Sequence, residues 1–105
     1  MTALGELEAC ANCFARTPSG FKTRMFAPAA GVVEDAATGS AAGPLAVHLV
    51  RHGRIEPGEQ IAIDQGAEIG RPSRLYASAH GSRAQIDRVE VGGSAVIVAR
   101  GEFVC

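Results

Sequence analysis

One apolar segment restricts the possible folds of this 105-residue chain more than any other; it begins at Ser40 and reads SAAGPLAVHLVRH. Its length and its small, aliphatic residues predict a helix over about residues 40–52. Because apolar side chains occur on nearly every side of that helix, we expect protein to surround it. The helix should begin between Ser40 and Pro44, since proline is tolerated best in the first turn.

Short segments with alternating polar and apolar residues follow the predicted helix, and glycine or proline separates them. This period of two predicts a meander of β-strands over about residues 58–104. Two further extended segments should precede the helix, joined by a tight turn at the sequence TPSG. The candidate strands are Cys13–Ala15, Thr23–Ala27, Gln60–Asp64, Arg74–Ala79, Gln85–Val91 and Ala95–Arg100. The sequence therefore predicts one α+β domain over residues 1–105, with a curved sheet or barrel wrapped around a central helix.

The sequence also predicts local structure near the two ends of the chain. Residues 2–11 should form a short helix or a frayed end. Near the other end, Gly92 and Gly93 separate the last two candidate strands and predict a hairpin turn with positive φ at both glycines.

Composition and charge argue against several classes of protein. Charged residues make up 20% of the chain and the formal net charge is -1, so we expect neither disorder nor a nucleic-acid partner. No run approaches the roughly 18 apolar residues that span a bilayer. The opening sequence MTALGELEAC carries two glutamates, where a secretory signal carries basic residues. We therefore expect a cytoplasmic protein with no membrane partner.

The cysteines and histidines do not form a convincing metal site. An odd count of cysteines, Cys10, Cys13 and Cys105, is a poor disulfide framework. The C-x-x-C spacing suits half of a zinc site, but His48 and His52 are the only other closely spaced pair of candidate ligands. We interpret the first two cysteines as incidental thiols and the two histidines as a core residue and a helix-end residue.

The residues before the helix form a candidate binding site. Asp35 lies just upstream of Thr38, Gly39 and Ser40. A helix N terminus carries unpaired amides and a partial positive charge, which together bind anions. Gly39 permits close approach of a ligand, and the neighbouring side chains add hydroxyl groups. The same residue types are also favoured helix caps, and capping requires no ligand. The residues alone leave both interpretations open.

Three longer stretches together carry a family resemblance: RMFAPAAGVVEDAATGSAAGPLAVHL, IDQGAEIGRPSRLYASA and RVEVGGSAVIVARGEF. In this order, from about Phe14 to Phe103, the chain resembles the C-terminal half of the PhzF-like phenazine-biosynthesis family. The resemblance implies the diaminopimelate-epimerase fold, in which two similar domains each wrap a curved sheet around a helix. The active site then lies between the two helix N termini and isomerises its substrate by proton transfer without a cofactor.

The resemblance also implies roles for individual residues. The family pattern Glu-Asp-Pro-Ala-Thr-Gly-Ser aligns with residues 34–40, where Ala36 replaces the usual proline. That replacement removes a conformational restraint but no reactive group. By this alignment Asp35 is the catalytic residue that handles the proton. The residues expected to bind the substrate carboxylate are Thr38, Gly39 and Ser40.

Part of such an active site would lie outside this chain. The principal catalytic glutamate and a substrate-binding histidine of the family belong to its N-terminal domain, whereas this chain matches the second domain. We therefore expect half of a cofactor-independent isomerase or epimerase that acts on a small cyclic or amino-acid-like carboxylate. The other half would come from a separately encoded domain or from a second copy in a homodimer. The alternative is a non-catalytic remnant that binds a small carboxylate or only dimerises.

Overall fold

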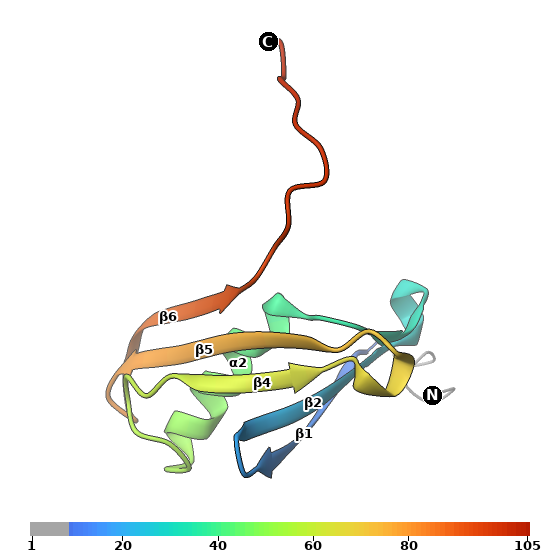
Figure 1. Ribbon diagram of the computed structural model, residues 1–105. Coiled ribbons are helices and arrows are strands. Elements are labelled where there is room, and N and C mark those ends of the chain that lie inside the picture. The colour runs from blue at the N-terminus through green and yellow to red at the C-terminus, as the bar shows by residue number, and fades with distance from the viewer. Residues whose placement is uncertain (1–8) are drawn as a thin grey trace.

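The computed structural model describes residues 9–105, in which one α-helix lies beside a six-stranded sheet (Figure 1). The elements in chain order are β1 (Ala11–Thr17), β2 (Gly20–Ala27), the short 3-10 helix η1 (Pro28–Ala30), β3 (Val32–Asp35), α2 (Gly39–Arg51), β4 (Ile61–Gln65), the 3-10 helix η2 (Ala67–Ile69), β5 (Ser73–Gly81) and β6 (Ile86–Gly93). The predicted α+β class is confirmed.

The strand order places a parallel pair at the centre of an otherwise antiparallel sheet. The order is β1-β2-β4-β5-β6, and β3 pairs with the remaining part of the β2 edge. Strands β2 and β4 are parallel, and every other pairing is antiparallel. Parallel neighbours require a long connection, and here that connection contains β3 and α2.

Five of the predicted segments are strands in the structure, and each lies within a few residues of its predicted bounds. In β2, alternate residues Phe21, Thr23 and Met25 are buried, and the turn at Pro18 joins β2 to β1. Strand β3 was not predicted, since its sequence VVED does not alternate. The expectation for residues 2–11 lies outside the described residues except for its last three positions, and Ala11 already belongs to β1.

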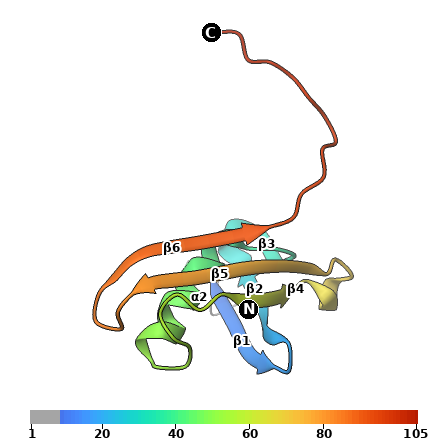
Figure 2. The same ribbon diagram turned by 60° about the vertical axis from the view of Figure 1, so that its left-hand side comes forward.

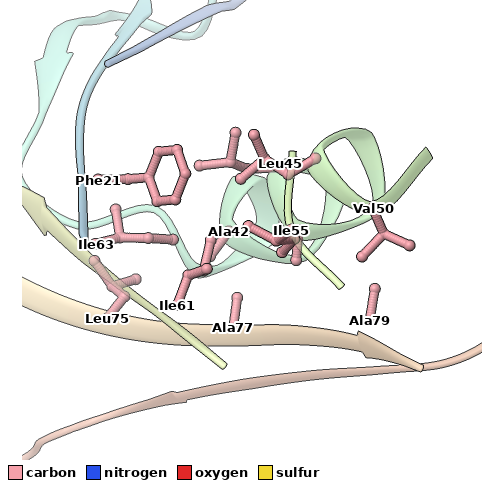
Figure 3. Close-up of a cluster of buried hydrophobic side chains, with 12 residues drawn as sticks. Phe21, Ala42, Leu45, Val50, Ile55, Ile61, Ile63, Leu75, Ala77 and Ala79 are labelled. Carbon is pink, nitrogen blue, oxygen red and sulfur yellow. The ribbon is translucent and has the colours of Figure 1, made fainter. Parts of the chain in front are cut away.

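The core lies between α2 and the sheet face that it covers (Figure 3). Leu49 and Val50 of the helix have no exposed surface, and Ile63 of β4 is 1% exposed. The side chains that complete the cluster are Phe21, Ala42, Leu45, Ala46, Ile55, Ile61, Leu75, Ala77 and Ala79. Small alanines on β5 let the helix pack closely against the sheet.

The sheet is not closed and covers only one side of the helix, so of the expected curved sheet or barrel, residues 9–105 do not form the barrel. Ser40, Pro44, His48 and Arg51 are exposed and form one open face of α2. Strands β1 and β6 are the two ends of the sheet and do not pair with each other. The apolar residues of the helix therefore pack on the sheet side, while its proline and polar residues lie in the gap between the two ends. The predicted start of the helix is also wrong by one residue, because α2 begins at Gly39.

The last predicted strand, Ala95–Arg100, is absent as a strand from the described structure. The segment from Ser94 to Cys105 has no regular secondary structure and extends away from the sheet (Figure 2). The expected hairpin turn is also wrong, since Gly92 and Gly93 are strand residues paired with Tyr76 and Leu75. Neither glycine has positive φ. Because the chain makes no turn at Gly92 and Gly93, the residues from Ser94 onward continue beyond the end of β6 and do not join the sheet.

Candidate functional site

Strand β2 brings the residues of the candidate site together. Along one edge of β2, Thr23 pairs with Gln65 of β4 and Met25 pairs with Asp35 of β3. The ends of β3 and β4 therefore lie side by side, although Asp35 and Gln65 are 30 positions apart in the sequence. The helix begins directly after this point, at Gly39.

The side chain of Gln65 holds the segment between β3 and the helix in place. It is 3% exposed, and its amide makes four hydrogen bonds. The Nε2 atom donates to the Asp35 carbonyl at 3.0 Å and to the Thr38 hydroxyl at 2.9 Å. The Oε1 atom accepts from the Thr38 amide at 3.2 Å and from the Thr23 hydroxyl at 3.3 Å. An amide offers two donors and two lone pairs, so this buried group is fully satisfied.

The carboxylate of Asp35 is held by the segment that follows it. Its Oδ2 atom accepts a hydrogen bond from the Thr38 hydroxyl at 2.6 Å, and its Oδ1 atom accepts one from the Ala36 amide at 2.9 Å. The Thr38 hydroxyl in turn accepts from Gln65, so it connects the two side chains. Because both oxygens of Asp35 are engaged, the carboxylate is fixed in orientation while each oxygen keeps a further lone pair.

No side chain caps the start of α2. Thr38 occupies the N-cap position but makes no capping hydrogen bond, because its hydroxyl is turned toward Asp35. The amides of Ala41 and Ala42 donate to the Thr38 carbonyl at 3.1 and 3.2 Å. Within residues 9–105, the amides of Gly39 and Ser40 have no hydrogen-bond partner, and both residues are exposed. The capping alternative is therefore wrong, and the start of α2 keeps two free donors.

Charged side chains lie on the other side of β3. Glu34, whose side chain is 7% exposed, accepts hydrogen bonds from Arg24 Nη2 at 2.7 Å and Nε at 3.1 Å. This pairing raises the pKa of Arg24. Glu68 pairs with Lys22, and the hydrogen bond from that lysine lowers the pKa of Glu68. Of the adjacent carboxylates, Glu34 is thus neutralised by an arginine, whereas Asp35 is held by hydroxyl and amide donors.

A close backbone contact at Gly66 supports the loop between β3 and α2. Gly66 follows Gln65 and has φ +92°, and a Cβ atom there would lie 2.2 Å from the Arg71 carbonyl oxygen and 2.7 Å from that of Ala36. Only glycine fits both the space and the backbone conformation. The loop after β4 therefore packs directly against the residue that follows Asp35.

The hollows of the surface lie beside the helix start rather than over it. A pocket of about 360 Å³ adjoins the loop at Ala37 and is bounded by Ser73, Arg74 and Ser94. A larger groove of about 610 Å³ runs along the open face of α2 beside Val89. Neither includes Gly39 or Ser40 in its lining. The free amides of Gly39 and Ser40 are therefore exposed and lie outside these pockets. A second protein surface would be needed to enclose a ligand bound to them.

Cysteines and histidines form no metal site in the part of the chain from residue 9 onward, where no three potential ligands come together. The three cysteines are unpaired and exposed. The prediction that His48 is a core residue is wrong, since its side chain is exposed. The centroid of its ring lies 4.4 Å from that of the His52 ring. Residues 9–105 also contain no helix that is long and apolar enough to cross a membrane.

The structure thus brings Asp35 and Thr38 together and places Gly39 and Ser40 at the adjacent helix start. Sequence reasoning missed the part played by Gln65. A signal was present, because in the sequence IAIDQ a polar residue occupies the inward position that follows Ile61 and Ile63. A polar side chain at such a position must find partners, and here they are the loop and the helix start.

Comparison with known proteins identifies the family. A family model described as phenazine biosynthesis-like protein matches residues 5–101. The chain therefore belongs to this family, and the resemblance seen in the sequence is confirmed.

Similar curated proteins are longer isomerases. The chain is 61% identical over 93 residues to trans-2,3-dihydro-3-hydroxyanthranilate isomerase of Pseudomonas chlororaphis, a match that covers 89% of this chain and 34% of the relative. The isomerase of the same name from Pseudomonas aeruginosa is 59% identical over 90 residues, or 86% of this chain and 32% of the relative. An uncharacterised isomerase of Escherichia coli is 35% identical over 83 residues, a match that covers 76% of this chain and 28% of the relative. The chain spans about a third of the length of the curated relatives it matches.

Proposed function

We propose that this chain supplies one half of a cofactor-independent isomerase that moves a proton on a small cyclic or amino-acid-like carboxylate, in phenazine-type or related metabolism. The observation that carries the proposal is the placement of a fixed Asp35 carboxylate beside an uncapped helix start. Names of the pseudomonad relatives support this reaction class, since they describe isomerases of a hydroxyanthranilate derivative.

The two parts of the site have separate tasks. The amides of Gly39 and Ser40 and the Ser40 hydroxyl bind the substrate carboxylate, and Thr38 sets the start of the helix. The positive end of the helix adds electrostatic attraction, and hydrogen bonds to a charged group are each worth roughly 1.5–3 kcal/mol. Asp35 takes up or returns the carbon-bound proton. Its two hydrogen bonds keep it in one orientation, so a bound substrate meets the same oxygen on each turnover.

The residues that complete the active site come from a polypeptide segment outside the matched region, which is about a third of the relatives' length. The helix start is exposed, whereas a proton-transfer site must exclude water and needs an acid or base on the opposite face of the substrate. We therefore place this chain as one half of a diaminopimelate-epimerase-like architecture. A separately encoded domain or a second copy of the chain would enclose the substrate between two helix starts.

Exchange of a carbon-bound proton tests the proposal directly. The chain, alone and mixed with a polypeptide that carries the remainder of the Pseudomonas chlororaphis relative, is incubated in deuterated buffer with trans-2,3-dihydro-3-hydroxyanthranilate. Proton NMR then follows loss of the carbon-bound proton. We expect exchange in at least one of the two samples, and exchange only in the mixture would identify a split enzyme. Carboxylate binding without exchange in either sample would reject catalysis and leave the binding-remnant alternative.

Variants separate binding from proton transfer. Asp35→Asn should abolish exchange while leaving carboxylate binding largely intact, and the matched change Asp87→Asn on exposed β6 should affect neither. Ser40→Ala should weaken binding by about tenfold at most, because the backbone donors remain. Full exchange activity in Asp35→Asn would assign the proton transfer to another residue.

A further inference from the structure

The orientation of the buried Gln65 amide is determined by two backbone groups. The Thr38 amide can only donate, so the Gln65 atom 3.2 Å from it is the acceptor Oε1. The Asp35 carbonyl can only accept, so the atom 3.0 Å from it is the donor Nε2. A flipped amide would bring donor against donor and acceptor against acceptor, so it is excluded. Strand β4 also pairs on both sides at Gln65, with Thr23 of β2 and Ser73 of β5, which holds its backbone in place.

This orientation sets the direction of the hydrogen bond between Thr38 and Asp35. One proton of Gln65 Nε2 is directed to the Asp35 carbonyl and the other to Thr38 Oγ1, over 3.0 and 2.9 Å. The Thr38 hydroxyl therefore accepts from Gln65, and its single proton is donated to Asp35 Oδ2 at 2.6 Å. The three side chains form one directed series, the Asp35 network, in which Gln65 donates to Thr38 and Thr38 donates to Asp35.

Without Gln65, the Thr38 hydroxyl would have a competing use. Thr38 occupies the N-cap position, where a threonine hydroxyl usually accepts from an amide of the first turn, and the Ser40 amide is free within residues 9–105. A hydroxyl turned toward Ser40 would leave Asp35. The carboxylate would then keep one hydrogen bond within the same residues, from the Ala36 amide to Oδ1. One hydrogen bond restrains a carboxylate less than two, so the orientation of Asp35 depends on Gln65.

We propose that Gln65 is a positioning residue for the proton transfer, an inference that rests on the proposed function. It commits the Thr38 hydroxyl to Asp35 and thereby keeps the carboxylate in the orientation in which it meets the substrate. Gln65 does not itself reach the substrate, because it is 3% exposed and the protein occupies all its donors and acceptors. Misplacement of a reacting group by about 1 Å can cost on the order of 100-fold in rate. Loss of the Asp35 network should therefore slow proton transfer more than it weakens binding.

Two variants of Thr38 test the network with little change in size. The exchange assay described above is repeated with the chain mixed with the polypeptide that carries the remainder of the Pseudomonas chlororaphis relative. Thr38→Val removes the hydroxyl and should lower the saturating rate of proton exchange by roughly 10- to 100-fold. Its half-saturating substrate concentration should stay within about threefold, and Thr38→Ser, which keeps the hydroxyl, should retain the rate within about threefold. The control Thr17→Val removes a hydroxyl that has no partner within residues 9–105, and it should change neither quantity.

A double variant tests whether Gln65 and Thr38 act in series. Gln65→Met removes the amide at similar size and should slow exchange by roughly the same factor as Thr38→Val. The two changes combined should slow it no further, because each breaks the same network. Losses that multiply, or a full exchange rate in Thr38→Val, would overturn the inference. If Gln65→Met does not fold, the comparison of Thr38→Val with Thr38→Ser decides alone.

Nuclear magnetic resonance of the isotope-labelled chain gives a readout that needs no activity. Both side-chain amide protons of Gln65 should exchange slowly with water, because both are donated to protein acceptors. In Thr38→Val one of the two should exchange faster, while the bond to the Asp35 carbonyl remains. Rapid exchange of both protons in the unmodified chain would overturn the inference. Slow amide exchange without substrate exchange in any sample would instead overturn the proposed function, and Gln65 would then only hold the loop.

Discussion

Removing the Gln65 side chain should destabilise the fold more than any comparable change at the surface. Gln65→Ala deletes one buried and three partly buried hydrogen bonds, each with a net value of about 0.5–1.5 kcal/mol. Thr38 lies near the surface, so water replaces part of the loss there. We expect the free energy of unfolding to fall by about 2–4 kcal/mol. For a domain of this size, that corresponds to an unfolding temperature lower by about 10–25 °C.

Thermal unfolding followed by circular dichroism measures this effect, and Gln60→Ala is the matched control. Gln60 immediately precedes β4 and is exposed, so its change should stay within about 0.5 kcal/mol. Gln65→Glu keeps the size and loses the donors, and it should destabilise less at about pH 5 than at about pH 7, because a protonated carboxyl donates one bond. Equal unfolding temperatures for the alanine variants at Gln65 and Gln60 would refute the role assigned to this network.

Two further predictions concern the surroundings of the site. Gly66→Ala should destabilise the fold by about 2–5 kcal/mol, since it combines backbone strain with overlap onto two carbonyl oxygens. Gly70→Ala, which also has positive φ but open space, should cost only about 1–2 kcal/mol in urea unfolding, and equal costs would contradict the close contact. The second prediction concerns Glu68, whose pKa the hydrogen bond from Lys22 lowers below the ordinary 4.5. Because the folded-state pKa of Glu68 is lower than its unfolded-state pKa, the ion pair stabilises the fold fully at pH values above the unfolded-state pKa. This contribution disappears as pH falls through the folded-state pKa. The difference in unfolding temperature between the unmodified chain and Lys22→Met should therefore shrink from about pH 7 to about pH 3, and a constant difference would contradict this coupling.

The sequence by itself determined the features that depend on local pattern. Alternation located β4, β5 and β6 to within a few residues, and the tight turn at TPSG located β1 and β2 on either side of it. The run after Ser40 located α2 to within one residue at its start. The family motif around Asp35 could also be recognised without coordinates, and the family comparison agrees with it. These features are local because side-chain periodicity and residue type are properties of a short segment.

Only the tertiary structure decided which segments meet. Pairing along one edge of β2 joins Asp35 to Gln65, and the resulting bond from Thr38 to Asp35 leaves the helix uncapped. The same limit explains the wrong expectation for Ala95–Arg100. A β-strand exists only when an adjacent edge accepts its hydrogen bonds, and a sequence pattern is the same whether that edge is present or absent. The side chains therefore predicted a strand, whereas the available partners decided that this segment stays outside the sheet.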